Sequence, residues 1–352
     1  MGSKSEAARV LVVGGPTAAG KSDLALRLAK ALDGEVLDVD SVHVYRGMDI
    51  GSCKLSRSAW GGIPHHLMDI REPDHPINAA DFVREAERVI RDVALRGKLC
   101  ILCGGSTLYL KALLYGLADL PPADPAVRHD LAKYSATKLH ALLLQSDPQT
   151  AARIHPNDRK RLVRAWETYL LSGVSQSVLQ TRHGFGTPRF DALILVLCRE
   201  RKDLYMRIQD RTDKILAEGL IEETRRLKER FGPEIAALQT VGYKQALFFL
   251  MGKLGRDNLS SEISKCTKRL AKQQMTFWRN EPLKRGWRIC PAAGDNSCSL
   301  DCGKALGSGG KGTRGFYALV YSFVELEKEI RKNFIEGAPG IELWYLDAHA
   351  LD

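Results

Sequence analysis

Long apolar runs are missing from this sequence of 352 residues. No stretch approaches the roughly 20 apolar residues that a membrane-spanning helix needs, so we expect no membrane association. The first six residues are polar and contain neither a signal-peptide core nor an Arg-rich presequence. The eight cysteines follow no pattern of a secreted disulfide framework. We therefore expect an intracellular protein in the cytoplasm, with an organellar or nuclear location left open.

Positive charge, in contrast, is abundant. The chain has 52 Lys and Arg against 42 Asp and Glu, which gives a formal net charge of +10. This excess favours a polyanionic partner such as a nucleic acid. A hydrophobic content of 44% predicts a sizeable core, and the length suggests two domains, or one large domain that carries an insertion.

A glycine-rich segment at residues 15–22 lies between the apolar run 10–13 and an amphipathic stretch at 23–32. It fits the pattern G-x-x-x-x-G-K-[ST], which predicts a strand, a phosphate-binding loop and a helix. Backbone N–H groups and the start of the helix would bind phosphate, Lys21 would add a charge, and Ser22 would be a ligand of phosphate-bound Mg²⁺. An ordinary glycine turn is the alternative. The predicted phosphate-binding residues are Gly15, Pro16, Thr17, Ala18, Ala19, Gly20, Lys21 and Ser22.

Strand-like runs alternate with helical patterns, as at 35–41, 98–103 and 191–198. This order predicts an α/β fold, a P-loop NTPase-like parallel sheet wrapped by helices. Ligands of such sheets bind at the carboxyl ends of the strands, so Asp40 and Ser106 are expected to share a cleft with the glycine-rich loop. Asp40 could hold Mg²⁺, act as a general base or cap a turn. The Ser106 hydroxyl could contact a phosphate or the acceptor, or cap a helix.

The patterns divide the chain into four parts. Residues 1–116 form the first part of the core, and 117–188 read as a mostly helical insertion crowded with Arg and Lys. Residues 189–285 hold a returning strand and helices at 202–229 and 260–278, which complete the core. Residues 286–352 form a tail of unassigned role, with a Gly- and Ser-rich flexible stretch at 290–315 and a helix at 317–334.

Two basic features follow the returning strand. Arg207 and Arg211 are spaced i and i+4, so they share a helix face and could clamp a diphosphate, although a solvated face is the commoner meaning of that spacing. The segment 265–279 joins many basic residues to Phe277 and Trp278. This mixture fits an RNA backbone with stacked bases, or alternatively a solvated basic helix with a core Trp.

Several motifs, taken together, resemble one family, the tRNA dimethylallyltransferases, also called tRNA isopentenyltransferases. The resemblance covers roughly Val10 to Arg279. It rests on the motifs at 15–22, 38–41, 44–51, 64–70, 80–82, 104–109, 155–158, 241–245 and 276–278.

The resemblance implies prenyl transfer. Dimethylallyl diphosphate would occupy the loop, and N6 of the adenosine immediately 3′ of the tRNA anticodon would attack its C1, with Mg²⁺ assisting the departure of diphosphate. Asp40 matches the carboxylate that accepts the proton, Ser22 the hydroxyl near Mg²⁺, and Ser106 a position where most members carry Thr. Lys21, Arg207 and Arg211 would stabilise charge on the leaving diphosphate.

The resemblance also implies that the insertion, 117–188, binds the anticodon stem-loop of tRNA, and that the target adenosine is flipped out of this loop into the protein. The residues implied in tRNA binding are Asp40, Ser41, His155, Asn157, Asp158, Arg161, Arg164, Lys272, Gln273 and Gln274. Gln273 stands where the family usually has Arg. The expected partners are tRNA and dimethylallyl diphosphate, and the expected state is a monomer. Alternatives are an adenylate isopentenyltransferase acting on free nucleotide, an ATP-binding P-loop kinase or NTPase, and a catalytically silent RNA-binding protein.

Overall fold

The computed structural model describes residues 8–185 and 188–285 and five shorter segments, 288–289, 297–299, 317–319, 323–335 and 341–347. The chain divides into two compact units. One, here the core unit, comprises Met1–Leu113 and Phe190–Asp352; the other, the helical unit, comprises Leu114–Arg189. The helical unit therefore begins three residues before the expected insertion and ends one residue after it.

The core unit is built on a sheet with the strand order β3-β2-β4-β1-β5-β9-β8-β7. The first six strands in this order, from β3 to β9, pair in parallel, and β7 and β8 pair antiparallel. A further short strand, β6, pairs with β9. The predicted α/β fold with a parallel sheet is confirmed. The strands are β1 (Arg9–Gly14), β2 (Gly34–Asp38), β3 (His65–His66), β4 (Leu99–Cys103), β5 (Asp191–Cys198), β6 (Arg288–Ile289), β7 (Ser297–Ser299), β8 (Tyr317–Leu319) and β9 (Ile341–Asp347).

The central strands β1, β4 and β5 are almost continuously buried, as expected for parallel strands covered by helices on both faces. Their register sets Val13 beside both Cys103 and Leu195, and Asp38 beside Cys103. The carboxyl ends of β1, β2 and β4 are therefore level. The loops that follow these three strands consequently start at one edge of the sheet.

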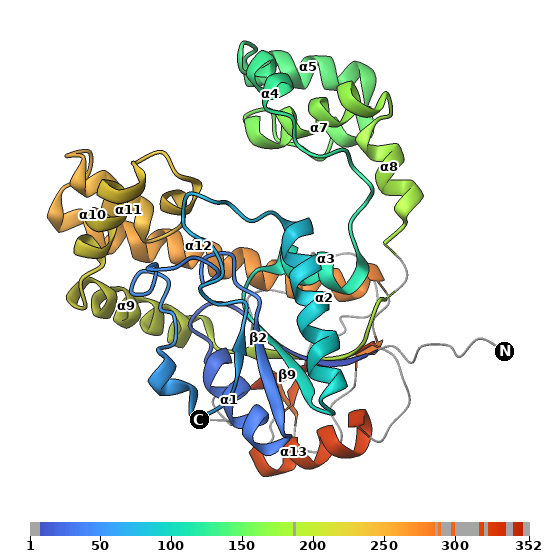
Figure 1. The fold of residues 1–352 in the computed structure, drawn as a ribbon, viewed down its shortest axis with the longest axis vertical. Coiled ribbons are helices and arrows are strands. Elements are labelled where there is room, and N and C mark those ends of the chain that lie inside the picture. The colour runs from blue at the N-terminus through green and yellow to red at the C-terminus, as the bar shows by residue number, and fades with distance from the viewer. Residues whose placement is uncertain are drawn as a thin grey trace. The chain divides into compact units, whose positions relative to one another are not determined.

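The core unit also contains helices on both sides of the sheet and in a group beside it (Figure 1). They are α1 (Lys21–Ala31), α2 (Ala79–Leu95), α3 (Thr107–Tyr115), α9 (Arg201–Ala217), α10 (Leu220–Phe231), α11 (Tyr243–Leu250), α12 (Arg256–Arg285) and α13 (Phe323–Ile330), with short helical turns at Arg57–Trp60, Ala236–Gln239 and Arg331–Ile335. In the described part of the chain, none of the helices is long and apolar enough to cross a membrane.

The helix expected over 202–229 is interrupted. Gly219 has φ 109°, in the left-handed region, and separates α9 from α10. Glycine adopts this conformation at no steric cost, so the chain turns there without strain. The helix expected at 260–278 is longer than predicted and extends over Arg256–Arg285.

The core unit does not end at residue 285, where the sequence patterns placed its limit. Strand β9 pairs with β5 over seven residues, Ala192 to Cys198, and so covers what would be an exposed sheet edge. Leu326, Ile330, Phe334 and Leu346 join the cluster of buried side chains that contains Leu28 of α1. Figure 1 shows α13 beside α1, where Arg27 lies over the ring of Phe323.

The tail also differs from its expected secondary structure. The helix predicted at 317–334 is instead β8, helix α13 and a π-helical turn, Arg331–Ile335. Of the stretch predicted to be flexible, 290–315, only β7 is among the described residues, so that expectation lies outside them.

The helical unit consists of α4 (Pro125–Ala132), α5 (Ala136–Ser146), α6 (Pro148–Ala151), α7 (Arg159–Ser172) and α8 (Gln176–His183). Its core cluster includes Leu131, Leu139, Leu143 and Leu162. Glu167 is also fully buried, and its carboxylate accepts hydrogen bonds from two arginine side chains, Arg128 and Arg164, and from the backbone N–H of Asp124. Because each oxygen is paired, this buried charge links α7 to α4 and its N-cap residue.

The loop after β2 is held in place by one buried carboxylate of α10. Glu223 is 3% exposed and accepts hydrogen bonds from the backbone N–H groups of Asp49 (3.1 Å), Ile50 (2.9 Å) and Gly51 (3.0 Å). The hydroxyl of Tyr243 donates a fourth, at 2.6 Å. These bonds fix the backbone immediately before Ser52 and Cys53.

Replacing Glu223 by Ala should therefore lower the free energy of unfolding by about 3 kcal/mol, because it leaves three backbone donors and a hydroxyl without their shared acceptor. The measurement is urea unfolding followed by circular dichroism. Glu222→Ala is the matched control, since Glu222 lies on the same helix but is exposed, and it should change stability by less than about 0.5 kcal/mol. Equal effects of the two changes would contradict this role of Glu223.

Candidate active site

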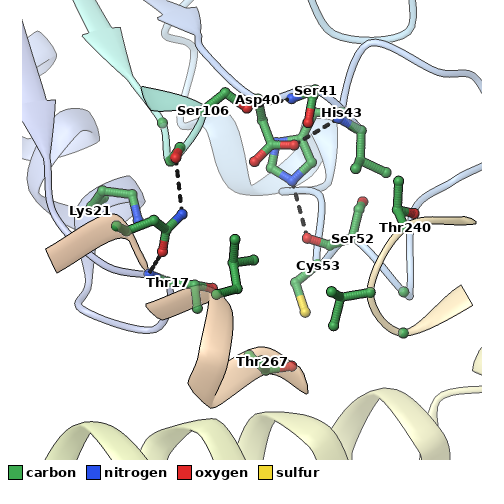
Figure 2. Close-up of a pocket in the computed structure, with 18 of the residues that line it drawn as sticks. Thr17, Lys21, Asp40, Ser41, His43, Ser52, Cys53, Ser106, Thr240 and Thr267 are labelled. Atoms are coloured by element: carbon green, nitrogen blue, oxygen red, sulfur yellow. Dashed lines mark hydrogen bonds between the residues drawn. The ribbon is translucent and has the colours of Figure 1, made fainter. Parts of the chain in front are cut away.

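A pocket of about 570 Å³ lies at the carboxyl ends of β1, β2 and β4 (Figure 2). The loops after these strands supply one side of its lining, and α9 and α12 supply the other. This is the position where open parallel sheets bind ligands. Among the residues predicted as functional, the pocket is lined by Thr17, Lys21, Ser22, Asp40, Ser41, Ser106, Arg211, Gln273 and Gln274.

The loop at 15–22 turns tightly between β1 and α1. Gly15 and Gly20 have φ of 129° and 100°, and Ala18 is also left-handed, with φ 65°. A Cβ at Gly15 would lie 2.7 Å from the carbonyl oxygen of Leu197, so only glycine fits there. Thr17, Lys21 and Ser22 line the pocket, while the remaining five residues form the turn that carries them.

Three cationic side chains donate to carbonyl oxygens of this loop. Lys21 Nζ lies 2.8 Å from the carbonyl of Pro16, and Arg207 Nε lies 3.0 Å from that of Ala18. Arg199, which is 4% exposed, donates from Nε to the carbonyl of Ala19 at 3.0 Å. These three hydrogen bonds hold the backbone of the loop in one conformation. Burial lowers the pKa of Lys21, an effect that nearby negative charges only partly offset.

The two arginines predicted as a clamp have separate roles. Arg207 supports the loop and is not among the pocket-lining residues, whereas Arg211 lines the pocket. The Arg211 guanidinium donates from Nη1 to Thr17 Oγ1 at 3.3 Å and from Nη2 to the carbonyl of Ser52 at 3.1 Å. It therefore joins the phosphate-binding loop to the loop after β2.

Asp40 lies in the pocket, and its Oδ1 accepts the backbone N–H of Val42 at 2.8 Å. Burial tends to raise the pKa of Asp40, but the charge of His43, the N–H groups of Val42 and His43, and the charge of Lys21 together lower it. Asp40 is thus an ionised carboxylate able to accept a proton. Beside it, Ser106 Oγ accepts the N–H of Ser41 at 3.0 Å, which leaves its own O–H to donate.

Gln274 is buried, although the sequence places it among residues that contact tRNA. Its Oε1 accepts the N–H of Thr17 at 2.8 Å and its Nε2 donates to the carbonyl of Gly105 at 3.0 Å. The side chain thereby ties the phosphate-binding loop to the loop after β4. Gln273 is exposed and lines the pocket, and Lys272 is exposed on the same helix. Contact of these three residues with tRNA stays a prediction.

The other predicted tRNA-binding residues belong to the helical unit. His155, Asn157 and Arg161 are exposed there. Asp158 caps α7 by accepting the N–H of Arg161 at 3.2 Å, and Arg164 donates to Glu167 and to the carbonyl of Pro121. Asp158 and Arg164 therefore have structural partners of their own, and their contact with tRNA also stays a prediction.

Arg199, Asp38 and His43 were not singled out as functional in the sequence. Asp38 is the last residue of β2, and His43 stands in the loop that follows; both line the pocket. The available signal was an Asp-x-Asp pair at a strand end, with a His three residues later. For Arg199, it was a charged residue directly after the long apolar strand β5.

Residues 43–281 match the model of the IPP transferase family. The chain belongs to this family. A protein of Citrifermentans bemidjiense named tRNA dimethylallyltransferase 1 is 43% identical over 282 residues, which cover 80% of this chain and 92% of the relative. A protein of the same name from Trichlorobacter lovleyi is 44% identical over 297 residues, covering 83% and 96%.

Solved structures of the family share the fold. The tRNA isopentenylpyrophosphate transferase of Staphylococcus epidermidis is 35% identical, with a TM-score of 0.57 over 77% of this chain and 90% of that one. A eukaryotic dimethylallyltransferase described as acting on tRNA is 29% identical, with a TM-score of 0.67 over 76% and 69%. The resemblance to tRNA dimethylallyltransferases expected from the motifs is thus confirmed.

Gln274→Ala should weaken binding of inorganic diphosphate with Mg²⁺ by about tenfold, or about 1.4 kcal/mol, because the loop at 15–22 loses its tie to Gly105. Isothermal titration calorimetry measures this affinity. Thr276→Ala, at an exposed position of the same helix, is the control and should leave the affinity unchanged. An unchanged affinity of the Gln274 variant would show that the tie does not order the phosphate site.

Proposed function

We propose that this protein is a tRNA dimethylallyltransferase. It transfers a dimethylallyl group from dimethylallyl diphosphate to N6 of the adenosine immediately 3′ of the anticodon, giving N6-isopentenyladenosine and diphosphate. One observation carries the proposal: an ionised carboxylate, Asp40, shares a single pocket with a phosphate-binding loop and with Arg211. A phosphate-binding loop beside a proton-accepting carboxylate suits transfer of a group from a diphosphate to an amine. The relatives named above carry this activity in their names.

The diphosphate would be held by the N–H groups of the loop and by the side chains of Lys21 and Arg211. As the C1–O bond breaks, negative charge develops on the leaving oxygen, and these fixed donors stabilise it without reorganising. Hydrogen bonds from Lys21, Arg199 and Arg207 to the carbonyls of the loop keep its N–H groups oriented before the substrate arrives.

Mg²⁺ fits this site as a companion of the diphosphate. The described residues contain no group of three or more His, Cys, Asp and Glu that could hold a metal alone. Mg²⁺ commonly takes most of its ligands from phosphate oxygens and water, so one protein oxygen such as the Ser22 hydroxyl suffices. When bound, the ion neutralises part of the charge on the leaving diphosphate.

At the acceptor side, the N6 amine attacks C1, the new C–N bond forms as C1–O breaks, and the amine proton passes to Asp40. The Ser41 N–H positions the Ser106 hydroxyl at the same edge of the pocket, where this hydroxyl can orient the acceptor adenine. The acceptor would come from tRNA, because the chain carries a separate helical unit with exposed His155, Asn157 and Arg161. We further propose a cytoplasmic monomer.

Asp40→Asn should lower kcat by about 10²-fold to 10⁴-fold while changing tRNA affinity less than about threefold, because the amide keeps the shape but cannot take the proton. The assay incubates the protein with Mg²⁺, dimethylallyl diphosphate and unmodified tRNA, and nucleosides from the digest are measured by mass spectrometry.

The wild-type protein in the same assay tests the proposed function. No prenylated adenosine in tRNA would overturn it. A product on AMP but none on tRNA would identify an adenylate isopentenyltransferase, and ATP turnover without prenyl transfer would identify a kinase or NTPase.

Arg161→Ala should weaken tRNA binding several-fold and reduce the slope of log affinity against log salt concentration by about one, as expected when one phosphate contact is lost. Filter binding at several salt concentrations measures both. Arg91→Ala removes an arginine of α2 that is also exposed, and is the control. Equal loss in both variants would mean that the helical unit supplies no particular contact at Arg161.

A further inference from the structure

Two charged side chains of the pocket have no part in the mechanism above. Asp38 and His43 line the pocket and are only 13% and 16% exposed. The Nδ1 atom of His43 lies 2.9 Å from Asp38 Oδ2. Its Nε2 atom lies 3.1 Å from the carbonyl oxygen of Ser52, a contact drawn in Figure 2. Both nitrogens of the ring therefore face oxygen acceptors.

This geometry requires a protonated ring. A carbonyl oxygen and an ionised carboxylate accept hydrogen bonds but cannot donate them, so each ring nitrogen must carry a proton. The other carboxylate oxygen, Asp38 Oδ1, is buried and has no hydrogen-bond partner among the described residues, whereas Oδ2 is bonded to His43. Burial lowers the pKa of His43, but the charges of Asp38 and Asp40 outweigh this and raise it to about 9.

The imidazolium acts on two parts of the site. The charge of the ring and the backbone N–H of His43 both favour the ionised form of Asp40, three residues earlier. On the other side, the Ser52 carbonyl that accepts from the ring also accepts from Arg211 Nη2 at 3.1 Å. His43 thus stands between the carboxylate that takes the proton and the arginine that faces the diphosphate.

We propose that Asp38 and His43 are a positioning pair, in which the imidazolium keeps Asp40 ionised and fixes the Ser52 carbonyl to which Arg211 is anchored. Asp38 supplies the counter-charge that keeps the ring protonated. The pair would hold the base and the diphosphate-binding side chain in one geometry. This inference rests on the proposed function, because it assumes that Asp40 accepts the proton and Arg211 contacts the diphosphate.

A second histidine–carboxylate pair in the same sheet offers a matched comparison. His66 Nε2 lies 2.7 Å from Glu35 Oε2, between the adjacent strands β3 and β2, and neither residue lines the pocket. Arg96 also bonds to Glu35, so this pair stabilises the fold without a link to Asp40. Its removal reports what the loss of such a pair does to stability alone.

Several other groups can influence the protonation of His43 and Asp40. They are Lys21 of α1, His65 of β3, Cys103 of β4, Tyr109 of α3 and Arg211 of α9. All of them are unchanged in the variants below, so a difference from wild type isolates the contribution of the pair.

The experiment measures kcat, KM and tRNA affinity against pH for His43→Gln, Asp38→Asn and the double variant. In His43→Gln the cation is lost, so Asp40 takes up a proton more readily. The acid limb of the kcat profile should move to higher pH by about one unit, and kcat should fall about tenfold or more, with tRNA affinity within about threefold of wild type.

Asp38→Asn keeps a hydrogen-bonding partner but removes the counter-charge, which lowers the pKa of His43. The ring then loses its proton at lower pH, and the alkaline limb of the kcat profile should move down by about one unit. The double variant removes both charges together and leaves no unpaired carboxylate. It should therefore be at least about fivefold more active than His43→Gln, a non-additive result expected of interacting residues.

The control variants are His66→Gln and Glu35→Gln, which should lower the melting temperature and leave both limbs of the profile in place. If the Asp38 and His43 variants behave like these controls, or if their effects simply add, the pair is structural only and the inference is wrong. Should His43→Gln fail to fold, the alkaline limb of Asp38→Asn decides. A wild-type protein without prenyl transfer would instead refute the proposed function, so the two failures are distinguishable.

Discussion

The whole site depends on how the carbonyl oxygens of the glycine-rich loop at 15–22, the predicted phosphate-binding loop, are held. A loop that turns its N–H groups toward an anion must place its carbonyls elsewhere, and buried carbonyls need donors. Here cationic side chains meet those of Pro16, Ala18 and Ala19, from Lys21, Arg207 and Arg199. Since α9 carries Arg207 and begins two residues after Arg199, the position of this helix against the loop sets the shape of the loop.

The pocket is closed by ties between loops that are far apart in the chain. Gln274 of α12 joins Thr17 to Gly105, and Arg211 joins Thr17 to Ser52. Glu223 anchors the backbone before Ser52. Each tie uses a polar group that is paired at both ends, so the pocket is ordered before a substrate enters. Such preorganisation is what allows fixed donors to stabilise charge that develops only during the reaction.

The C-terminal segments contribute to the same framework. By pairing with β5, β9 converts a sheet edge into an interior strand, and α13 adds apolar side chains to the cluster around α1. Because β5 leads directly to Arg199 and α9, packing that stabilises β5 also stabilises the support of the phosphate-binding loop. The tail, for which the sequence patterns suggested no role, is in its described parts a component of the core.

The sequence by itself determined the α/β fold and the placement of the glycine-rich loop, Asp40 and Ser106 after the ends of strands, because strand periodicity and loop motifs depend on neighbouring residues. It also supported the family through motifs spread over most of the chain. Only the tertiary structure decided that Arg207 supports the loop while Arg211 lines the pocket, and that Gln274 is buried between two loops. It likewise brought out Arg199 and the Asp38–His43 pair. The roles of Arg199, Arg207, Arg211 and Gln274 depend on contacts between distant segments, which local patterns cannot encode. For the two arginines of α9, the same spacing suits a solvated helix face equally well.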